Sequence, residues 1–187
     1  RLRAVFVDTG LVYPAIRELV KGCGDRVVWL KQKMPFPQVI KKHGYPVVSK
    51  NISYYVEQVR SLISRGLQHT QTYILRMFGI KSNGQKASSH SVLSKKWRFL
   101  LDAPFKCSAK CCDVMKKKPL KAYAKKTGRV PMIGIMADEG QSRRNAYTKH
   151  GCNAFNHSEP QSWPLSFWNE CDIWKYIKEN NMPYSKI

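Results

Sequence analysis

One short segment, residues 132–144, carries the residue types best suited to chemistry. Its first half, Met132 to Met136, is an apolar run that predicts a buried strand. Its second half combines two acids, a serine and two arginines: Asp138, Glu139, Ser142, Arg143 and Arg144. Arginine supplies planar donors that suit phosphate or sulfate, and a helix starting at about residue 142 would offer free N–H groups to an anion. The pattern predicts an anion-binding site, although an ordinary helix start with a solvated arginine pair fits it equally well.

The elements that must position this segment begin with a strand–helix–strand pattern at the start of the chain. A strand over residues 2–7 ends in the turn Asp8-Thr9-Gly10, and a helix from Pro14 leads to a second strand at 27–30. Because a crossover helix joins neighbouring parallel strands, the pattern favours a parallel sheet.

The sequence therefore predicts an α/β fold with an open, mostly parallel twisted sheet, helices on both faces and a helical insertion. We expect three parallel, adjacent strands, at about residues 2–8, 26–31 and 132–137. The turns at 8–10 and 138–144 would then share the edge where ligands bind, at the carboxyl ends of the strands.

A single domain is expected over residues 1–187, with a mostly helical, basic insertion at 52–128. Apolar residues fall at helical spacing from Ser53 to about Phe78, where Gly66 is expected to separate two helices. Further helices are expected at 36–43, 97–101, 119–126 and 169–180. The chain begins at a strand and ends just after a helix, so the domain is expected to be incomplete at both ends.

The formal net charge is +21, from 33 Lys and Arg against 12 Asp and Glu, which indicates an anionic partner. From Lys106 to Arg129 there are nine basic residues and one acid, Asp113. Four lysines in this run would track the phosphate backbone of tRNA or DNA: Lys110, Lys116, Lys117 and Lys118. A solvated basic face explains the same run equally well.

The cell compartment is inferred from apolar runs and cysteines. No apolar run approaches 18 residues, so we expect no membrane partner, and the start of the chain lacks a signal-peptide pattern. The six cysteines lack the regular spacing of a disulfide framework. Reduced thiols in a cytoplasmic protein are therefore expected.

Three of the cysteines, Cys107, Cys111 and Cys112, lie within six residues. Thiolates at such spacing can hold an iron–sulfur cluster or zinc, with Cys152 as a candidate fourth ligand. Neighbouring lysines would instead lower the pKa of a thiol and make it reactive. Packing as small hydrophobic side chains is the third interpretation.

Several motifs, taken in order along the chain, resemble the phosphoadenosine phosphosulfate (PAPS) reductase family. Val7-Asp8-Thr9-Gly10 followed by Tyr13-Pro14 resembles that family's strand, turn and helix start. Glu139 with Arg143 resembles its substrate segment. The closing segment resembles the family's tail at Pro164, Leu165, Trp168, Asp172, Tyr176, Ile177, Pro183 and Tyr184.

Two other stretches are similar to phage and bacterial members of this family: His43 to Lys50, and Cys111-Cys112 with the lysines that follow. The family's phosphate loop would lie before Arg1, and its C-terminal cysteine segment would lie after Ile187. Ala15 and Gly140 stand where the family commonly has Glu and Ser. Either the chain is trimmed at both ends, or the protein has lost chemistry and kept binding.

The resemblance implies an adenine nucleotide alpha-hydrolase-like fold that binds PAPS or adenosine 5'-phosphosulfate (APS). The turn Asp8-Thr9-Gly10 would border the nucleoside, and Glu139, Arg143 and Arg144 would hold the anionic end, with Asp138 and Ser142 also in the nucleotide-binding segment. Sulfonate would pass to a cysteine thiolate and leave as sulfite, with a thioredoxin-type reductant. One alternative is a sulfurtransferase that uses ATP and magnesium to modify tRNA or DNA. Another is a non-catalytic nucleic-acid or virion-associated binding protein that keeps the fold.

Overall fold

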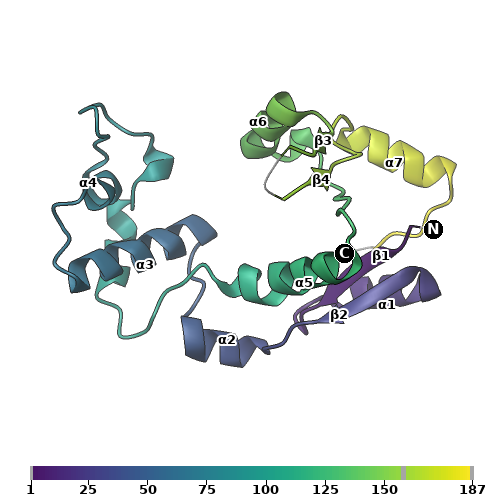
Figure 1. The fold of residues 1–187 in the computed structure, drawn as a ribbon, viewed down its shortest axis with the longest axis horizontal. Coiled ribbons are helices and arrows are strands. Elements are labelled where there is room, and N and C mark those ends of the chain that lie inside the picture. Colours follow the sequence, from purple (N-terminus) through teal and green to yellow (C-terminus); the bar gives the residue numbers. More distant parts are fainter. Residues whose placement is uncertain (1, 157–158, 186–187) are drawn as a thin grey trace. The chain divides into compact units, whose positions relative to one another are not determined.

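The structure, a computed structural model, describes residues 2–156 and 159–185 and divides into two compact units (Figure 1). We call residues 1–6, 11–30 and 120–187 the sheet unit, and residues 7–10 and 31–119 the helical unit. Within the described residues, no helix combines the length and apolar character needed to cross a membrane.

Two strands, β1 (Ala4–Asp8) and β2 (Val27–Lys31), pair as a parallel sheet; most of their residues lie in the sheet unit, and residues 7, 8 and 31 at their ends belong to the helical unit. The connecting helix α1 (Pro14–Gly22) starts at a proline, whose fixed φ and missing N–H suit the first turn of a helix. Phe6 and Trp29 contact edge to face, with ring centroids 4.9 Å apart. The predicted α/β fold class with a parallel sheet is thus confirmed.

The prediction of a third strand at residues 132–137 is wrong. Residues 132–137 do not join the β1–β2 sheet, and Met132 makes only an isolated parallel bridge with Ser162. Pro131 has no N–H to extend the pairing, and the Ile135 N–H turns back to the Ile133 carbonyl at 3.0 Å. The apolar run is also largely exposed, with Met132 at 56%.

Among its described residues, the sheet unit also contains three further α-helices and a small antiparallel ladder. The helices are α5 (Lys118–Thr127), whose first two residues belong to the helical unit, α6 (Gln141–His150) and α7 (Glu170–Glu179). Strand β3 (Asn153–Ala154) pairs with β4 (Gln161–Ser162). The side chain of Asn169 accepts the Asp172 N–H at 3.1 Å, and Asp172 accepts the Asn169 N–H at 2.9 Å, which fixes the start of α7.

The helical unit contains α2 (Phe36–His43), α3 (Lys50–Ser64) and α4 (Gln71–Phe78). The predicted separation of two helices near Gly66 is confirmed, and the predicted helix at 97–101 is a 3-10 helix over Lys95–Leu101. The core lies between α3 and the following loops, and its buried members are Tyr55, Val56, Leu93, Leu100 and Cys107.

A close backbone approach closes the helical unit where α2 ends. Gly44 has a φ of +103°, and a Cβ added there would lie 2.4 Å from the Lys106 carbonyl oxygen. The Tyr45 N–H donates to that same oxygen at 2.7 Å, and the Ser108 N–H donates to the Tyr45 carbonyl at 3.0 Å. The chain can pass here only because glycine has no side chain.

We therefore expect Gly44→Ala to lower the free energy of unfolding by about 2–4 kcal/mol, since it adds both backbone strain and a steric clash. Gly66→Ala is the matched control, because Gly66 also has a positive φ, +68°, but has open space around it. The control should cost only about 1–2 kcal/mol. Urea unfolding followed by circular dichroism measures the free energy of unfolding of both variants. An equal loss in the two would show that the predicted steric clash at residue 44 does not occur.

Candidate functional site

The predicted anion-binding segment forms a short 3-10 turn, Ala137–Glu139, followed by α6. Glu139 folds back so that its Oε1 accepts the Met136 N–H at 2.8 Å. Gly140 separates the two elements with a φ of +156°, a conformation that side chains disfavour. Its carbonyl accepts the N–H groups of Arg143 and Arg144, both at 3.0 Å, which starts the helix.

Both arginines of α6 are held by acids from the preceding turn. Arg143 Nη1 lies 2.6 Å from Glu139 Oε2, and Arg144 Nη2 lies 3.3 Å from Asp138 Oδ1. The four side chains are between 33% and 63% exposed, so each pair contributes at most about 1 kcal/mol. The acids therefore place the guanidinium groups beside the N-terminus of α6 without binding them tightly. Ser142 is exposed in the same first turn.

The other half of the predicted nucleotide site is the turn after β1. Asp8 and Thr9 are buried, at 9% and 5% exposure, and Gly10 has a φ of +72°. Asp8 Oδ1 accepts the Gly10 N–H at 3.0 Å, and the Thr9 carbonyl accepts Gln32 Nε2 at 3.1 Å. These bonds make a closed turn at the carboxyl end of a strand. The sequence interpretation missed Gln32, although a polar amide directly after β2 is a signal for this edge.

The two halves belong to different units: the turn 8–10 to the helical unit and the segment 138–144 to the sheet unit. That they form one nucleotide site therefore stays a prediction. Each half is internally ordered by its own hydrogen bonds and ion pairs, as described above.

The four cysteines of the predicted cluster differ in how deeply they are buried. Cys107 is in the core of the helical unit, Cys111 is partly buried and Cys112 is exposed, while Cys152 belongs to the sheet unit. Within the described residues, no three His, Cys, Asp or Glu side chains are gathered as a metal site would require. An iron–sulfur cluster or zinc ion stays a prediction.

The pKa values of two of these thiols, Cys107 and Cys111, are raised and not lowered overall. Burial raises the pKa of Cys107, and nearby Arg60 offsets this only in part. Burial and then Cys112 raise the pKa of Cys111, although Lys116 lowers it. Desolvation therefore outweighs the nearby cation in each case, Arg60 at Cys107 and Lys116 at Cys111.

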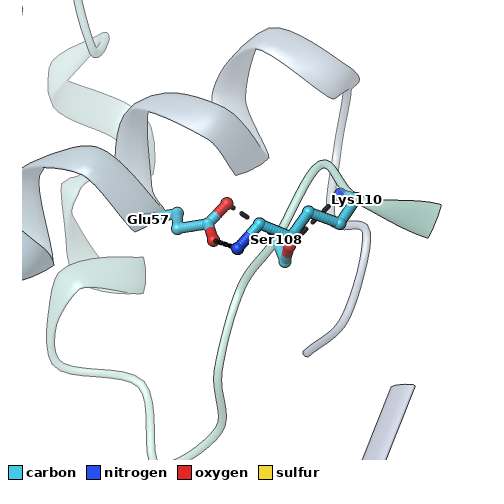
Figure 2. Close-up of polar contacts among 3 residues, drawn as sticks. All are labelled: Glu57, Ser108 and Lys110. Atoms are coloured by element: carbon cyan, nitrogen blue, oxygen red, sulfur yellow. Dashed lines mark hydrogen bonds and ion pairs between the residues drawn. The ribbon is translucent and has the colours of Figure 1, made fainter. Parts of the chain in front are cut away.

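Helix α3 anchors residues 103–110, which contain Cys107 and lead into the helical segment of Cys111 and Cys112 (Figure 2). Ser108 is 1% exposed, and its hydroxyl donates to Glu57 Oε2 at 3.3 Å. Lys110 Nζ lies 3.2 Å from Glu57 Oε1. One turn further, Arg60 donates to the carbonyls of Phe105 at 2.6 Å and Ala103 at 3.1 Å.

The sequence interpretation missed Glu57 and Arg60. The available signal was two charged residues, three apart, directly beside the inward-facing Val56 and Val59. Charged side chains next to core positions often reach over to satisfy buried polar groups.

The four lysines of the predicted nucleic-acid surface are all exposed, but two already have acid partners. Lys110 pairs with Glu57, and Lys117 pairs with Asp113 at 3.0 Å. Lys116 and Lys118 form no ion pair with any described residue. Fewer lysines of the basic run are therefore available to bind phosphates than its composition indicates.

The thiols yield a testable order of reactivity. At pH 7–8, iodoacetamide should modify exposed Cys112 well before Cys107 and Cys111, because a raised pKa leaves less thiolate at a given pH. The rates at Cys107 and Cys111 should keep rising above the usual thiol pKa range. Peptide mass spectrometry at several pH values measures this, with the denatured chain as the control in which all three react alike. Labelling of native Cys107 as fast as Cys112 would contradict the burial.

Comparison with known proteins gives two matches. A family model described as the phosphoadenosine phosphosulfate reductase domain matches residues 17–187. An adenosine 5'-phosphosulfate reductase from Staphylococcus haemolyticus is 30% identical over 82 residues, which cover 41% of this chain and 30% of that protein. The similarity thus spans less than a third of that relative's length.

Proposed function

The chain belongs to the phosphoadenosine phosphosulfate reductase family, and we propose that it binds an adenylyl sulfate nucleotide and takes part in reducing its sulfate to sulfite. The family match over residues 17–187 and the similarity to an APS reductase both support this substrate class. PAPS and APS are the candidate nucleotides.

The observation that carries the proposal is the arginine pair at the start of α6. Two guanidinium groups and the free N–H groups of the first helical turn favour an oxyanion with several acceptor oxygens. The exposed ion pairs to Glu139 and Asp138 can yield to such an anion at small cost. The sulfate and phosphate groups of the nucleotide carry the negative charge that complements these arginines.

In the proposed reaction a thiolate attacks the sulfur of the nucleotide. The bond from sulfur to the bridging phosphate oxygen breaks, and the nucleotide leaves with a free phosphate while the thiol carries the sulfonate. A second thiol, from a thioredoxin-type reductant, then attacks the first, which releases sulfite and leaves a disulfide. Arg143 and Arg144 would hold the negatively charged groups in place during the first step. Cys107 and Cys111 are poor nucleophiles near neutral pH because their pKa values are raised.

Replacing Arg143 or Arg144 by Ala should weaken nucleotide binding by about 1.5–3 kcal/mol, the scale of a charge-assisted hydrogen bond. Calorimetry with APS, PAPS and ATP measures this and also ranks the three nucleotides. Tight binding of ATP alone would favour the ATP-dependent sulfurtransferase alternative.

The matched control is Arg129→Ala, which removes an exposed arginine outside the α6 segment. It should leave the affinity within about 0.5 kcal/mol of the wild type. Unchanged affinity in both α6 variants would remove the arginine pair from the site. No binding of any of the three nucleotides by the wild type would overturn the proposed function.

A further inference from the structure

A separate pocket of about 280 Å³ lies in the helical unit, where α2 meets the loop before the cysteines. Its lining combines two lysines, an aromatic ring and apolar side chains: Pro37, Ile40, Lys41, Gly44, Tyr45 and Lys106. The proposed nucleotide chemistry uses none of these residues. We call this pocket and its rim the Tyr45 surface.

The pocket has a fixed backbone. Tyr45 is hydrogen-bonded through its N–H to Lys106 and through its carbonyl to Ser108, as described above, and Gly44 leaves no room between the two segments. Ser108 is in turn held by Glu57 of α3. A ligand here would meet a preformed wall, so binding would require little ordering of the chain.

The wall presents an aromatic ring to solvent. Tyr45 is 48% exposed, although its ring packs edge to face on Phe105, with centroids 5.4 Å apart and an interplanar angle of 72°. Phe105 is itself 38% exposed. An aromatic ring that is held by a neighbour and still half exposed is a platform on which a planar base can stack.

Cations surround the platform. Lys41 and Lys106 line the pocket and are exposed. Lys42, Lys110 and Lys118 lie near enough to His43 that, after burial, they lower its pKa, while Glu57 raises it. That one acid is already bound by Lys110 and Ser108. The lysines that act on His43 thus outnumber the one acid that does so, and Lys41 and Lys106 add two further cations at the pocket itself.

We propose that the Tyr45 surface binds single-stranded nucleic acid, with one base stacked on Tyr45 and the adjoining phosphates on Lys41 and Lys106. A positive groove beside an exposed aromatic ring is the combination that single-strand binders use, since every base has a stacking face. A duplex hides those faces within its own stack. A mononucleotide could stack its base on the Tyr45 ring, but it would leave most of the surrounding lysines without a phosphate partner.

The experiment is fluorescence anisotropy of the full chain with labelled 12-nucleotide poly(dT) and poly(U), over a series of salt concentrations. Wild-type affinity should fall linearly with salt on logarithmic axes. Tyr45→Ala should weaken binding about 5- to 100-fold, and Tyr45→Phe should restore it, because stacking needs the ring and not the hydroxyl. Lys41→Ala with Lys106→Ala should flatten the salt slope by about 1.4, for two lost phosphate contacts.

The charge-matched control is Lys81→Ala with Lys86→Ala, which removes two exposed lysines from another loop of the helical unit. It should leave the salt slope near that of the wild type. Circular dichroism of each variant establishes that Tyr45→Ala remains folded, and the double-lysine variants test the surface independently of that ring.

Three outcomes would overturn the proposal. The first is binding that does not depend on salt, and the second is equal behaviour of the two double-lysine variants. The third is displacement of the strand by adenosine monophosphate when both are present at the same concentration of nucleotides. That result would indicate a pocket for a mononucleotide. Loss of nucleotide binding in the Arg143 variant with intact strand binding would separate this surface from the proposed reductase function.

Discussion

The helical unit depends on polar side chains of α3 that hold a loop lacking regular secondary structure. Glu57 and Arg60 bind two carbonyls and two side chains within residues 103–110, which otherwise have a single backbone bridge, to Tyr45, as regular pairing among the described residues. Ser53 serves the neighbouring turn in the same way, since its hydroxyl both accepts the Val47 N–H and donates to the Val47 carbonyl at 2.8 Å. Because buried carbonyls and N–H groups without partners are costly, these contacts are what allow an irregular loop to approach the core.

Part of the chain's large positive charge has this structural role. Arg76 lies 4.0 Å over the Tyr55 ring and donates to Gln58 and to the Ser91 carbonyl. Arg98 donates to carbonyls of Leu93 and Met77. The planar guanidinium group presents its donors in a rigid fork and can lie flat on an aromatic ring, which suits it to this role. Arg60, Arg76 and Arg98 thus help to hold the helical unit together, whereas its lysines are exposed, although Lys110 also pairs with Glu57.

Local patterns predicted the helices well, and they failed where the answer depended on distant segments. Helical spacing, Pro14 and Gly66 marked α1, α3 and α4 because their signals lie within a few residues. The apolar run at 132–136 could not be assigned in the same way. Short apolar runs fit strands and extended loops alike, and pairing with Ser162, some thirty residues away in sequence, decided it.

The same division holds for the candidate sites. The pair Glu139–Arg143 is a local i,i+4 contact, and its spacing is visible in the sequence. The raised pKa of Cys107 depends on burial among core side chains that are distant in sequence, which a reading of neighbouring lysines could not reveal. Glu57 and Ser108, 51 positions apart, could be related only by the folded structure.

The backbone bridge between Tyr45 and Cys107 joins two segments that are far apart in sequence. Two backbone hydrogen bonds connect them, and Gly44 leaves no slack, so neither segment can move without the other. An occupant that shifted Tyr45 would therefore act directly on the backbone that carries buried Cys107.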